Sequence, residues 1–340
     1  MKKYHIALVG ATGAVGTEML KILEERAFPI ESIRLFAHES EAGKKVKFMG
    51  SEITVEKVEE DKISGIDIAF FAAGPISKTL APVFAKKGAV VIDNGSSFRL
   101  DPSVPLVIPE INPEDVDWHN GIISNPNCAT IIMCVPMKPI YDYAGVTRII
   151  VSTYQAASGA GIKGIAELDE QVRCYAENKP IPEPKAFTYP IAFNVIPHID
   201  VFMEQDYTKE EWKMYHETRK IFHDPELKIT TTAVRVPVMR SHSESILLET
   251  KKKITPEEVK DLLSKAPGVK VYDDPSNNIY PVPINTQGQD LIYVGRIRQD
   301  TSSENGILLW ACGDQIRKGA ATNAVQIGEV LIQRGLLDKK

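Results

Sequence analysis

Residues 4–16, which read YHIALVGATGAVG, constrain the fold of this chain more than any other stretch. The run YHIALV has the composition of a strand, and the segment GTEMLKILEER that follows repeats apolar residues at helical spacing. A strand, a glycine-rich turn and a helix in this order are typical of a dinucleotide-binding unit. The glycines allow a tight turn and let the backbone approach a pyrophosphate at the helix N-terminus. We therefore expect a nucleotide cofactor to bind at Gly10, Thr12, Gly13, Ala14 and Val15.

The same alternation continues through the first third of the chain. Strand-like runs at residues 32–37, 67–73 and 89–97 are separated by helical stretches such as SKTLAPVFAKKGA. Alternation of this kind predicts a parallel sheet with helices on both faces.

The polar segment AHESEAGK follows the second of these strands, where such folds contact the adenosine ribose. An acidic residue there favours NAD and a basic residue favours NADP. Glu39 or Glu41 could accept hydrogen bonds from ribose hydroxyls, and Lys44 or Lys45 could meet a phosphate. A solvated polar turn explains each of these residues equally well, so the segment alone leaves the cofactor open.

Composition excludes several other classes of protein. The 340 residues are 43% hydrophobic and 25% charged, which is typical of a globular protein with two domains. The net charge is −5 without a basic block, so we expect neither nucleic acid nor an anionic membrane as a partner. No apolar run approaches the roughly 20 residues that cross a bilayer. The two N-terminal lysines precede a strand that is too short for a signal peptide.

The four cysteines are scattered through the chain without a CxxC pair. This spacing favours neither a disulfide framework nor a zinc cluster, so we expect no metal and a reducing, cytoplasmic location. Cys128 follows the turn-forming SNPN at the start of a helical run, where a helix N-terminus would stabilise a thiolate. Cys134 lies within the apolar run itself and is expected in the core.

Later segments carry polar residues that a packed scaffold would not need. TYQAASGAG follows a strand-like run, and RVPVMRSHSE precedes another. Together with GATGAVG, DNGSSFR, SNPNC and DQIRKGAATNAVQI, in this order and over nearly the whole chain, they resemble the aspartate-β-semialdehyde dehydrogenase family.

The resemblance implies an activity and a set of catalytic residues. Members of the family reduce L-aspartyl-4-phosphate with NADPH to aspartate semialdehyde and phosphate, a step toward lysine, threonine, methionine and isoleucine. Cys128 matches the nucleophile that forms a thioester, which a hydride then reduces. His242 matches the acid–base histidine, and Gln155 matches the residue that orients the acyl-enzyme.

The resemblance also implies substrate contacts. Arg235 matches the arginine that binds the substrate carboxylate, for which a planar guanidinium is well suited. Phosphate recognition would come from Arg99 and Lys213, and the substrate ammonium would meet Glu210. Glu211 remains the alternative to Glu210, because the two are adjacent in KEEWKM.

Cofactor contacts implied by the resemblance include Ser158 and Gly159, on the nicotinamide side, and Gln315 near the C-terminus. Many bacterial members read ARSAGK after the second strand, where arginine and serine hold the 2′-phosphate of NADP. Ser40 and Glu41 stand at those two positions here. A glutamate would repel the phosphate, so we expect NADP as the family cofactor but a better tolerance of NAD than in relatives.

The family's fold, similar to that of glyceraldehyde-3-phosphate dehydrogenase, implies an α/β architecture. A Rossmann-type dinucleotide-binding domain would cover residues 1–126 and be completed by about 317–340, whose C-terminal helix returns to it. An α+β catalytic and dimerisation domain with a mixed sheet would cover residues 127–316. Its expected strands are residues 147–155, 228–238, 244–252 and 291–300. A homodimer or a dimer of dimers is implied, and the sequence does not choose between them.

Two alternatives explain the sequence less well. N-acetyl-glutamyl-phosphate reductase and glyceraldehyde-3-phosphate dehydrogenase share the fold logic, but the flanks SNPNC and RVPVMRSH fit them less well. A nucleotide-binding module whose cysteine acts as a redox sensor belongs to a different class. Such a module would not need Gln155, Arg235 and His242 in register, so the sequence favours an enzyme.

Overall fold

The computed structural model describes residues 2–337, and contacts along the chain divide it into two compact units. The first unit runs to Asn127 and resumes at Ala320, and the second is Cys128–Gly319. Domain boundaries at residues 126 and 316 stay predictions.

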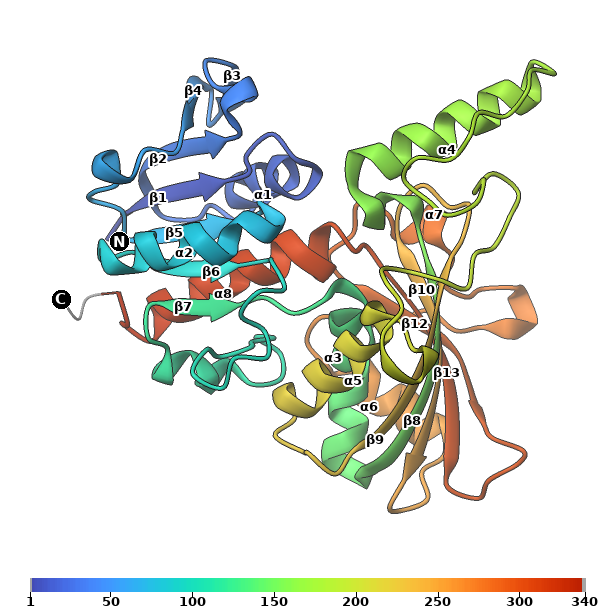
Figure 1. Ribbon diagram of the computed structural model, residues 1–340. Coiled ribbons are helices and arrows are strands. Elements are labelled where there is room, and N and C mark those ends of the chain that lie inside the picture. The colour runs from blue at the N-terminus through green and yellow to red at the C-terminus, as the bar shows by residue number, and fades with distance from the viewer. Residues whose placement is uncertain (1, 338–340) are drawn as a thin grey trace. The chain divides into compact units, whose positions relative to one another are not determined.

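The first unit contains a seven-stranded sheet in the order β3-β4-β2-β1-β5-β6-β7 (Figure 1). All neighbours pair in parallel except β3 and β4, which form an antiparallel hairpin. The order reverses around β1, so the carboxyl end of β1 is the switch point where α/β sheets bind ligands. The strands are β1 (Tyr4–Val9), β2 (Ile30–Ala37), β3 (Lys45–Phe48), β4 (Ser51–Lys57), β5 (Ile68–Phe71), β6 (Val90–Asp93) and β7 (Ile122–Ser124).

Helices cover both faces of this sheet, as the alternating pattern predicts. Successive side chains of a strand point to opposite faces. Leu8 belongs to a buried cluster with residues of α1 and α8, while Val9 belongs to another with Phe84 of α2. The helices are α1 (Ala14–Glu25), α2 (Ser77–Lys86) and α8 (Thr322–Gln333). The prediction that the C-terminal helix returns to the first domain is confirmed, since Val325 and Leu331 of α8 lie in this core.

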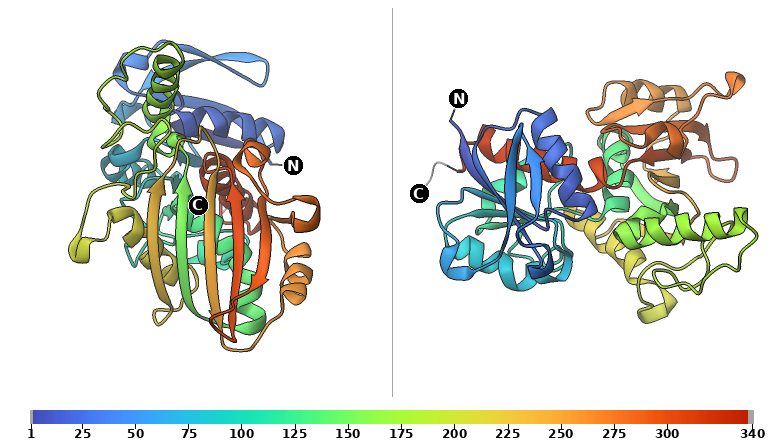
Figure 2. Two further views of the ribbon diagram at one scale, coloured as in Figure 1. Left: turned by 90° about the vertical axis from the view of Figure 1, so that its right-hand side faces the viewer. Right: turned by 90° about the horizontal axis from the view of Figure 1, so that it is seen from above.

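The second unit contains a six-stranded mixed sheet in the order β11-β12-β13-β10-β8-β9, seen face on in Figure 2. The pairs β8–β9 and β11–β12 are parallel and the others antiparallel, which confirms the predicted mixed sheet. Two of its strands, β11 and β13, were not predicted. The strands are β8 (Val146–Gln155), β9 (Lys228–Arg235), β10 (His242–Thr250), β11 (Val269–Val271), β12 (Ile292–Gln299) and β13 (Gly306–Gly313).

One face of the mixed sheet is covered by helices and carries the core of this unit. The helix α3 packs on β10, β13, β12 and β8, α5 packs on β9, and α6 packs on β11 and β12. On the other face, the rings of Tyr154 and Trp310 lie at a tilt of 41° with their centroids 5.3 Å apart, and both stay partly exposed. The helices are α3 (Cys128–Ala144), α4 (Gly161–Ala176), α5 (Lys209–Ile221), α6 (Pro256–Ser264) and the short α7 (Pro283–Thr286).

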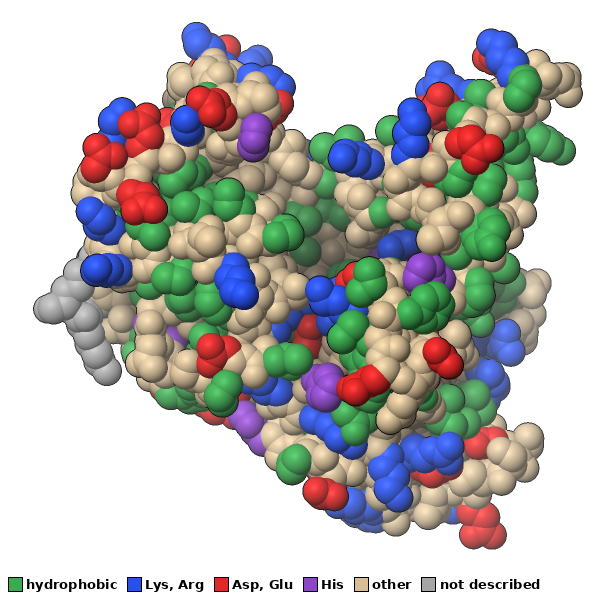
Figure 3. Space-filling model, in the orientation of Figure 1, with side chains coloured by type: hydrophobic (Ala, Val, Ile, Leu, Met, Phe, Trp, Pro, Cys, Tyr) green, Lys and Arg blue, Asp and Glu red, His purple; other side chains and the backbone are tan. Residues whose placement is uncertain are grey.

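Two surface properties bear on partners. Basic and acidic side chains are interspersed over the face drawn in Figure 3. Across residues 2–337, no helix combines the length and the apolar character that a membrane span requires.

Candidate active site

The glycine turn after β1 leaves room for a ligand that side chains would otherwise fill. Gly10 has a φ of +89°, and a Cβ there would meet Ala72 O at 2.5 Å. A Cβ on Gly16 would meet Gly10 O at 2.1 Å, so only glycine lets α1 pack this close to the strand. Gly13 precedes α1 and no side chain caps this helix start. The turn therefore fits a pyrophosphate bound by backbone N–H groups.

A cavity of about 660 Å³ opens above this turn, within the size range of small-molecule pockets. Of the five residues predicted here, Gly10, Thr12 and Gly13 line the cavity, and Ala14 and Val15 begin α1 behind it. Its other lining residues are Val9, Ala37, His38, Glu39, Lys57, Val58, Ala72, Ala73, Pro75, Ile76 and Leu80.

The segment after β2 forms a 3₁₀ turn, Glu39–Glu41. Its residue Glu39 lines the cavity, whereas Glu41 binds Lys44 with 2.7 Å between Oε2 and Nζ. Ser40 N donates to Nδ1 of His38, 3.3 Å away, which caps the turn. Cofactor contacts of Ser40 and Glu41 stay predictions.

Arg99 also lies in the first unit, after β6, and its side chain is buried. Its Nη2 donates to Asn94 O over 2.8 Å. Burial raises the pKa of nearby Asp93, and the positive charge of Arg99 opposes that rise. The structure holds this guanidinium in place without testing its role in phosphate binding.

The second unit places Cys128 beside His242. Cys128 is the first residue of α3, as predicted, and is partly exposed. Its Sγ lies 3.5 Å from Nε2 of His242, the fully buried first residue of β10. On the other side of the ring, Ala156 N donates to Nδ1 over 3.0 Å. Because a backbone N–H can only donate, Nδ1 carries a lone pair and the proton of the neutral ring sits on Nε2.

The electrostatics of the site agree with this tautomer. Burial lowers the pKa of His242 to about 3, the positive charge of Arg235 lowers it further, and Glu210 opposes both. The ring is therefore neutral near pH 7 and offers Nε2–H to the sulfur of Cys128. This arrangement stabilises a thiolate by hydrogen bonding, and the start of α3 adds partial positive charge.

Arg235 ends β9 and is buried next to the same histidine. Its Nη1 donates to Ala156 O over 2.7 Å. Burial lowers the pKa of Arg235, while Glu210 and Cys128 act in the opposite direction. An arginine stays charged in proteins, so this guanidinium is a buried cation with further N–H groups for an anion.

Gln155 and Lys213 both bind the carboxylate of Glu210. Gln155 pairs with Arg235 in the sheet register, and its Nε2 donates to Glu210 Oε1 over 3.2 Å. Lys213 Nζ lies 2.9 Å from Glu210 Oε2 and 2.9 Å from Asp200 Oδ2. Burial alone would lower the pKa of Lys213, but the two carboxylates raise it to about 12. Asp200 was not predicted, because a lone loop aspartate carries no recognisable signal.

Glu210 and Glu211 are distinguished by their partners. Glu211 forms a capping box with Thr208 at the start of α5, and its Oε1 also accepts from Ala233 N over 2.9 Å. Both of its oxygens are thus used by the scaffold. Glu210 instead directs its oxygens to Gln155 and Lys213.

The backbone of Gly159 lies close to the buried side chains of Arg235 and His242. It lies in the 3₁₀ turn Ala157–Ala160, between β8 and α4. A Cβ at Gly159 would meet Arg235 Nη1 at 2.5 Å and His242 Cε1 at 3.2 Å. Any other residue would displace one of these groups.

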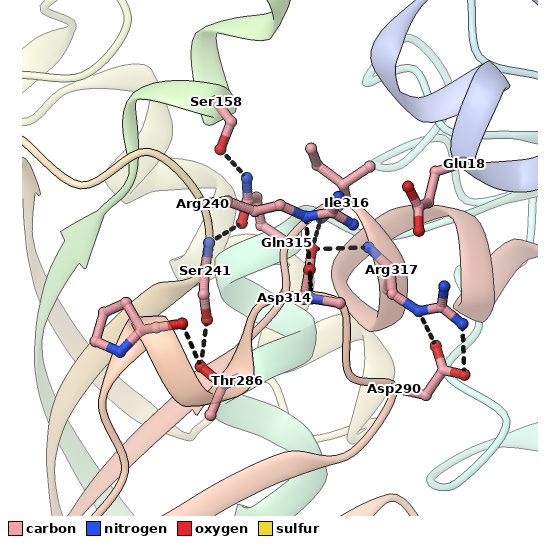
Figure 4. A network of polar contacts seen from close by, with 12 residues as sticks. Glu18, Ser158, Arg240, Ser241, Thr286, Asp290, Asp314, Gln315, Ile316 and Arg317 are labelled. Carbon is pink, nitrogen blue, oxygen red and sulfur yellow. Dashed lines mark hydrogen bonds and ion pairs between the residues drawn. The ribbon is translucent and has the colours of Figure 1, made fainter. Parts of the chain in front are cut away.

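Gln315 joins this turn to the residue before His242 (Figure 4). Its Nε2 donates to Ser158 Oγ, and its Oε1 accepts from Ser241 N over 2.9 Å. Ser241 has a φ of +79°, which is strained for a residue other than glycine, and its Oγ lies 2.6 Å from Thr286 Oγ1. The two contacts hold the backbone that carries His242. Neither Ser241 nor Thr286 was predicted.

The predicted residues thus fall into two groups, one in each unit. The first unit contains Gly10, Thr12, Gly13, Ala14, Val15, Ser40 and Glu41, together with Arg99. The second unit gathers the remaining ones around one thiol and one imidazole; these are Cys128, Gln155, Ser158, Gly159, Glu210, Lys213, Arg235, His242 and Gln315.

Two family models match the chain. Residues 5–119 match the semialdehyde dehydrogenase NAD binding domain, and residues 137–318 match the semialdehyde dehydrogenase dimerisation domain. The first unit is therefore an NAD(P)-binding domain, and the second carries a dimerisation domain.

Relatives and solved structures agree with these matches. The aspartate-semialdehyde dehydrogenase of Aquifex aeolicus is 55% identical over 338 residues, which cover 98% of this chain and 99% of that protein. The Bacillus subtilis enzyme of the same name is 46% identical over 98% of this chain and 99% of its own. The crystal structure of aspartate semialdehyde dehydrogenase II from Vibrio cholerae, complexed with ASA, superposes with a TM-score of 0.95 at 46% identity, covering 98% of this chain and 99% of that one. On the strength of these likenesses and of the shared two-domain fold, this chain belongs to the aspartate-semialdehyde dehydrogenase family.

Proposed function

We propose that the protein reduces L-aspartyl-4-phosphate to L-aspartate 4-semialdehyde with NAD(P)H through a thioester on Cys128. The observation that carries the proposal is the 3.5 Å approach of Cys128 Sγ to the Nε2–H of buried His242. A histidine that serves only the core would not be aimed at a sulfur at the start of a helix.

In the first step, the thiolate of Cys128 attacks the acyl carbon. A C–S bond forms, the bond between that carbon and the phosphate oxygen breaks, and phosphate leaves with a proton from solvent. The Nε2–H of His242 and the N-terminus of α3 support the thiolate before attack.

In the second step, a nicotinamide held by Ser158, Gly159 and Gln315 would supply the hydride that reduces the thioester. The acyl carbon on Cys128 then carries an oxyanion, which collapses to the aldehyde as the C–S bond breaks and the thiolate returns. This sequence needs no proton from the protein. His242 therefore acts as a hydrogen-bond donor to sulfur or oxyanion rather than as the acid–base shuttle that the resemblance implies.

Substrate recognition follows from the charges around this pair. We assign the substrate carboxylate to Arg235, the ammonium to Glu210, and the phosphate to Lys213 and Arg99. The buried guanidinium and the paired Glu210 and Lys213 support these assignments. Gln155 would orient the acyl group, because its amide already lies against Glu210.

For the cofactor, we assign the nicotinamide side to Ser158, Gly159 and Gln315 and the ribose side to the segment that contains Ser40 and Glu41. We expect the enzyme to accept NADH better than its relatives do. The test compares kcat/KM for NADPH and NADH, and a preference of more than about 100-fold for NADPH would contradict this assignment.

We further propose that the protein is a cytoplasmic homodimer that uses the open face of its mixed sheet. That face carries the partly exposed Tyr154, Leu308 and Trp310, and a matched dimerisation domain includes it. A second copy would remove these side chains from water. Light scattering in solution distinguishes a monomer, a dimer and a dimer of dimers.

The activity is tested with the phosphate-dependent oxidation of aspartate semialdehyde by NADP⁺ and NAD⁺. N-acetylglutamate semialdehyde and glyceraldehyde 3-phosphate serve as competing substrates. We expect turnover with aspartate semialdehyde only when phosphate is present. Equal or faster turnover of either competitor would assign the protein to the corresponding related enzyme.

A further inference from the structure

The cavity beside the glycine turn contains one ion pair at its outer end. Glu39 Oε1 and Lys57 Nζ lie 2.8 Å apart, and both residues line the cavity. Of the described residues in this lining, Lys57 carries the only amine and Glu39 the only carboxylate. A charged group of a ligand at this end would therefore meet these two side chains.

Backbone register fixes where the pair stands. Lys57 is the last residue of β4 and lies opposite Ala37, the last residue of β2, in the parallel pairing of the two strands. Glu39 follows Ala37 by two residues. Both side chains thus rise from the carboxyl edge of the sheet, where a bound dinucleotide presents its adenosine ribose.

The neighbouring charged side chains already form ion pairs with other residues. Glu41 is bound to Lys44, and Arg34 holds Glu56 with 2.7 Å between Nη2 and Oε2. The apolar part of the cavity wall, which includes Val58, Ile76 and Leu80, suits an adenine base. Glu39 and Lys57 then remain to contact the ribose hydroxyls or a phosphate on them.

Their pairing lets both side chains exchange partners easily. The two side chains are 70% and 49% exposed, and exposed ion pairs contribute little to stability. The hydrogen bond from Lys57 lowers the pKa of Glu39, so the carboxylate is charged at neutral pH. Lys57 can therefore leave Glu39 for a phosphate, and Glu39 can accept from a hydroxyl while still neutralised by Lys57.

We propose that the Glu39–Lys57 pair reads the 2′ position of the cofactor, with Lys57 binding the 2′-phosphate of NADP and Glu39 accepting from the 2′-hydroxyl of NAD. The inference rests on the proposed use of NAD(P)H and names the residues that decide between the two cofactors. It supplies a cationic phosphate partner, which neither Ser40 nor Glu41 can be.

The test measures binding rather than turnover. The protein is titrated with 2′,5′-ADP and with 5′-AMP in isothermal titration calorimetry. These two ligands differ only in the 2′-phosphate. We expect Lys57→Met to weaken 2′,5′-ADP by about 10-fold or more and to leave 5′-AMP within about twofold. Glu39→Gln should do the reverse, binding 2′,5′-ADP more tightly and 5′-AMP more weakly. Lys57→Arg should restore 2′,5′-ADP binding.

Lys62→Met is the matched control, because Lys62 pairs with Glu59 in the same way, with 2.7 Å between Nζ and Oε2, but does not line the cavity. Equal weakening of both ligands in Lys57→Met, or a loss of 2′,5′-ADP in Lys62→Met as large as in Lys57→Met, would overturn the inference. A wild-type protein that binds neither nucleotide, nor NAD⁺ or NADP⁺, would instead overturn the proposed cofactor use.

Discussion

Cys128 Sγ and His242 Nε2 lie 3.5 Å apart, and the backbone N–H of Ala156 decides which of them donates the hydrogen bond. A thiol beside an unprotonated Nε2 would make the histidine a base. Here the lone pair of the ring is occupied on the Nδ1 side, so Nε2 faces the sulfur with its proton. His242 therefore presents a neutral hydrogen-bond donor to the sulfur of Cys128.

This relationship predicts an unusual pH dependence of catalysis. Because the pKa of His242 is lowered to about 3, kcat/KM for aspartate semialdehyde should show no ionisation of this residue near pH 6–7. His242→Gln offers an amide N–H close to the position of Nε2 and should retain at least about 10-fold more activity than His242→Ala. A change in kcat/KM with a midpoint near pH 6.5 that is absent in His242→Gln would show that the histidine titrates during turnover.

The same pKa shift predicts how stability responds to acid. An unfolded histidine has a pKa of about 6.5, so the unfolded state binds the extra proton between that value and the folded pKa of about 3. The free energy of unfolding should therefore fall as pH drops from about 6.5 toward about 3. In His242→Gln this contribution is absent, and the difference in urea midpoint between pH 7 and pH 5 should shrink. An unchanged difference would mean that His242 does not contribute to the acid sensitivity of the fold.

Two cysteines in α3 provide a paired test of the nucleophile. Cys128 begins the helix and faces His242, whereas Cys134 is fully buried and contacts Thr218 Oγ1 at 3.6 Å. Burial raises the pKa of the Cys134 thiol, which keeps it protonated. Cys128→Ala should lower turnover by at least about 10³-fold with NADP⁺ binding retained, and Cys134→Ala should stay within about threefold of wild type. Substantial turnover in Cys128→Ala would refute its assignment.

The sequence predicts those features that depend on local pattern. β1 is found at Tyr4–Val9 as predicted, because all of its residues except His5 are buried and form a strand-like apolar run. The hairpin of β3 and β4 escaped prediction because KVKF and SEITVEK alternate with charged residues and are short. The strand β13 was also not predicted, although its run GILLWACG is as apolar as a buried strand.

The same distinction holds for the site. Cys128 was expected at a helix start from the turn residues before it, and it is found there. The strained backbone of Ser241 depends on Gln315, which is 74 residues away in the chain. Contacts of this kind are invisible in a local pattern, so tertiary positioning residues such as Ser241 and Asp200 emerge only from the structure.

The close approach at Gly159 predicts a loss of activity without loss of fold. Gly159→Ala would push against Arg235 Nη1 and His242 Cε1, which lie at 2.5 and 3.2 Å from the added Cβ. We expect kcat/KM to fall by about 10²-fold, since small displacements of positioned groups have effects of this size. Gly161→Ala, at the start of α4 directly after this turn, meets nothing within 4 Å and has only the backbone strain of its φ of +74°. Equal losses of activity in the two variants would mean that the close approach to Arg235 and His242 is not the reason for the loss in Gly159→Ala.

Glu210 and Glu211 are adjacent but should have separable functions. Glu211→Gln places an amide NH₂ where one carboxylate oxygen accepts from Thr208 N or Ala233 N, so the free energy of unfolding should fall by about 1–3 kcal/mol. Its KM for aspartate semialdehyde should change little. Glu210→Gln keeps an acceptor for Gln155 but removes the charge that would bind an ammonium, so KM should rise by about 10-fold or more. Urea unfolding and steady-state kinetics on both variants make the comparison, and a larger rise in KM for Glu211→Gln would exchange the two assignments.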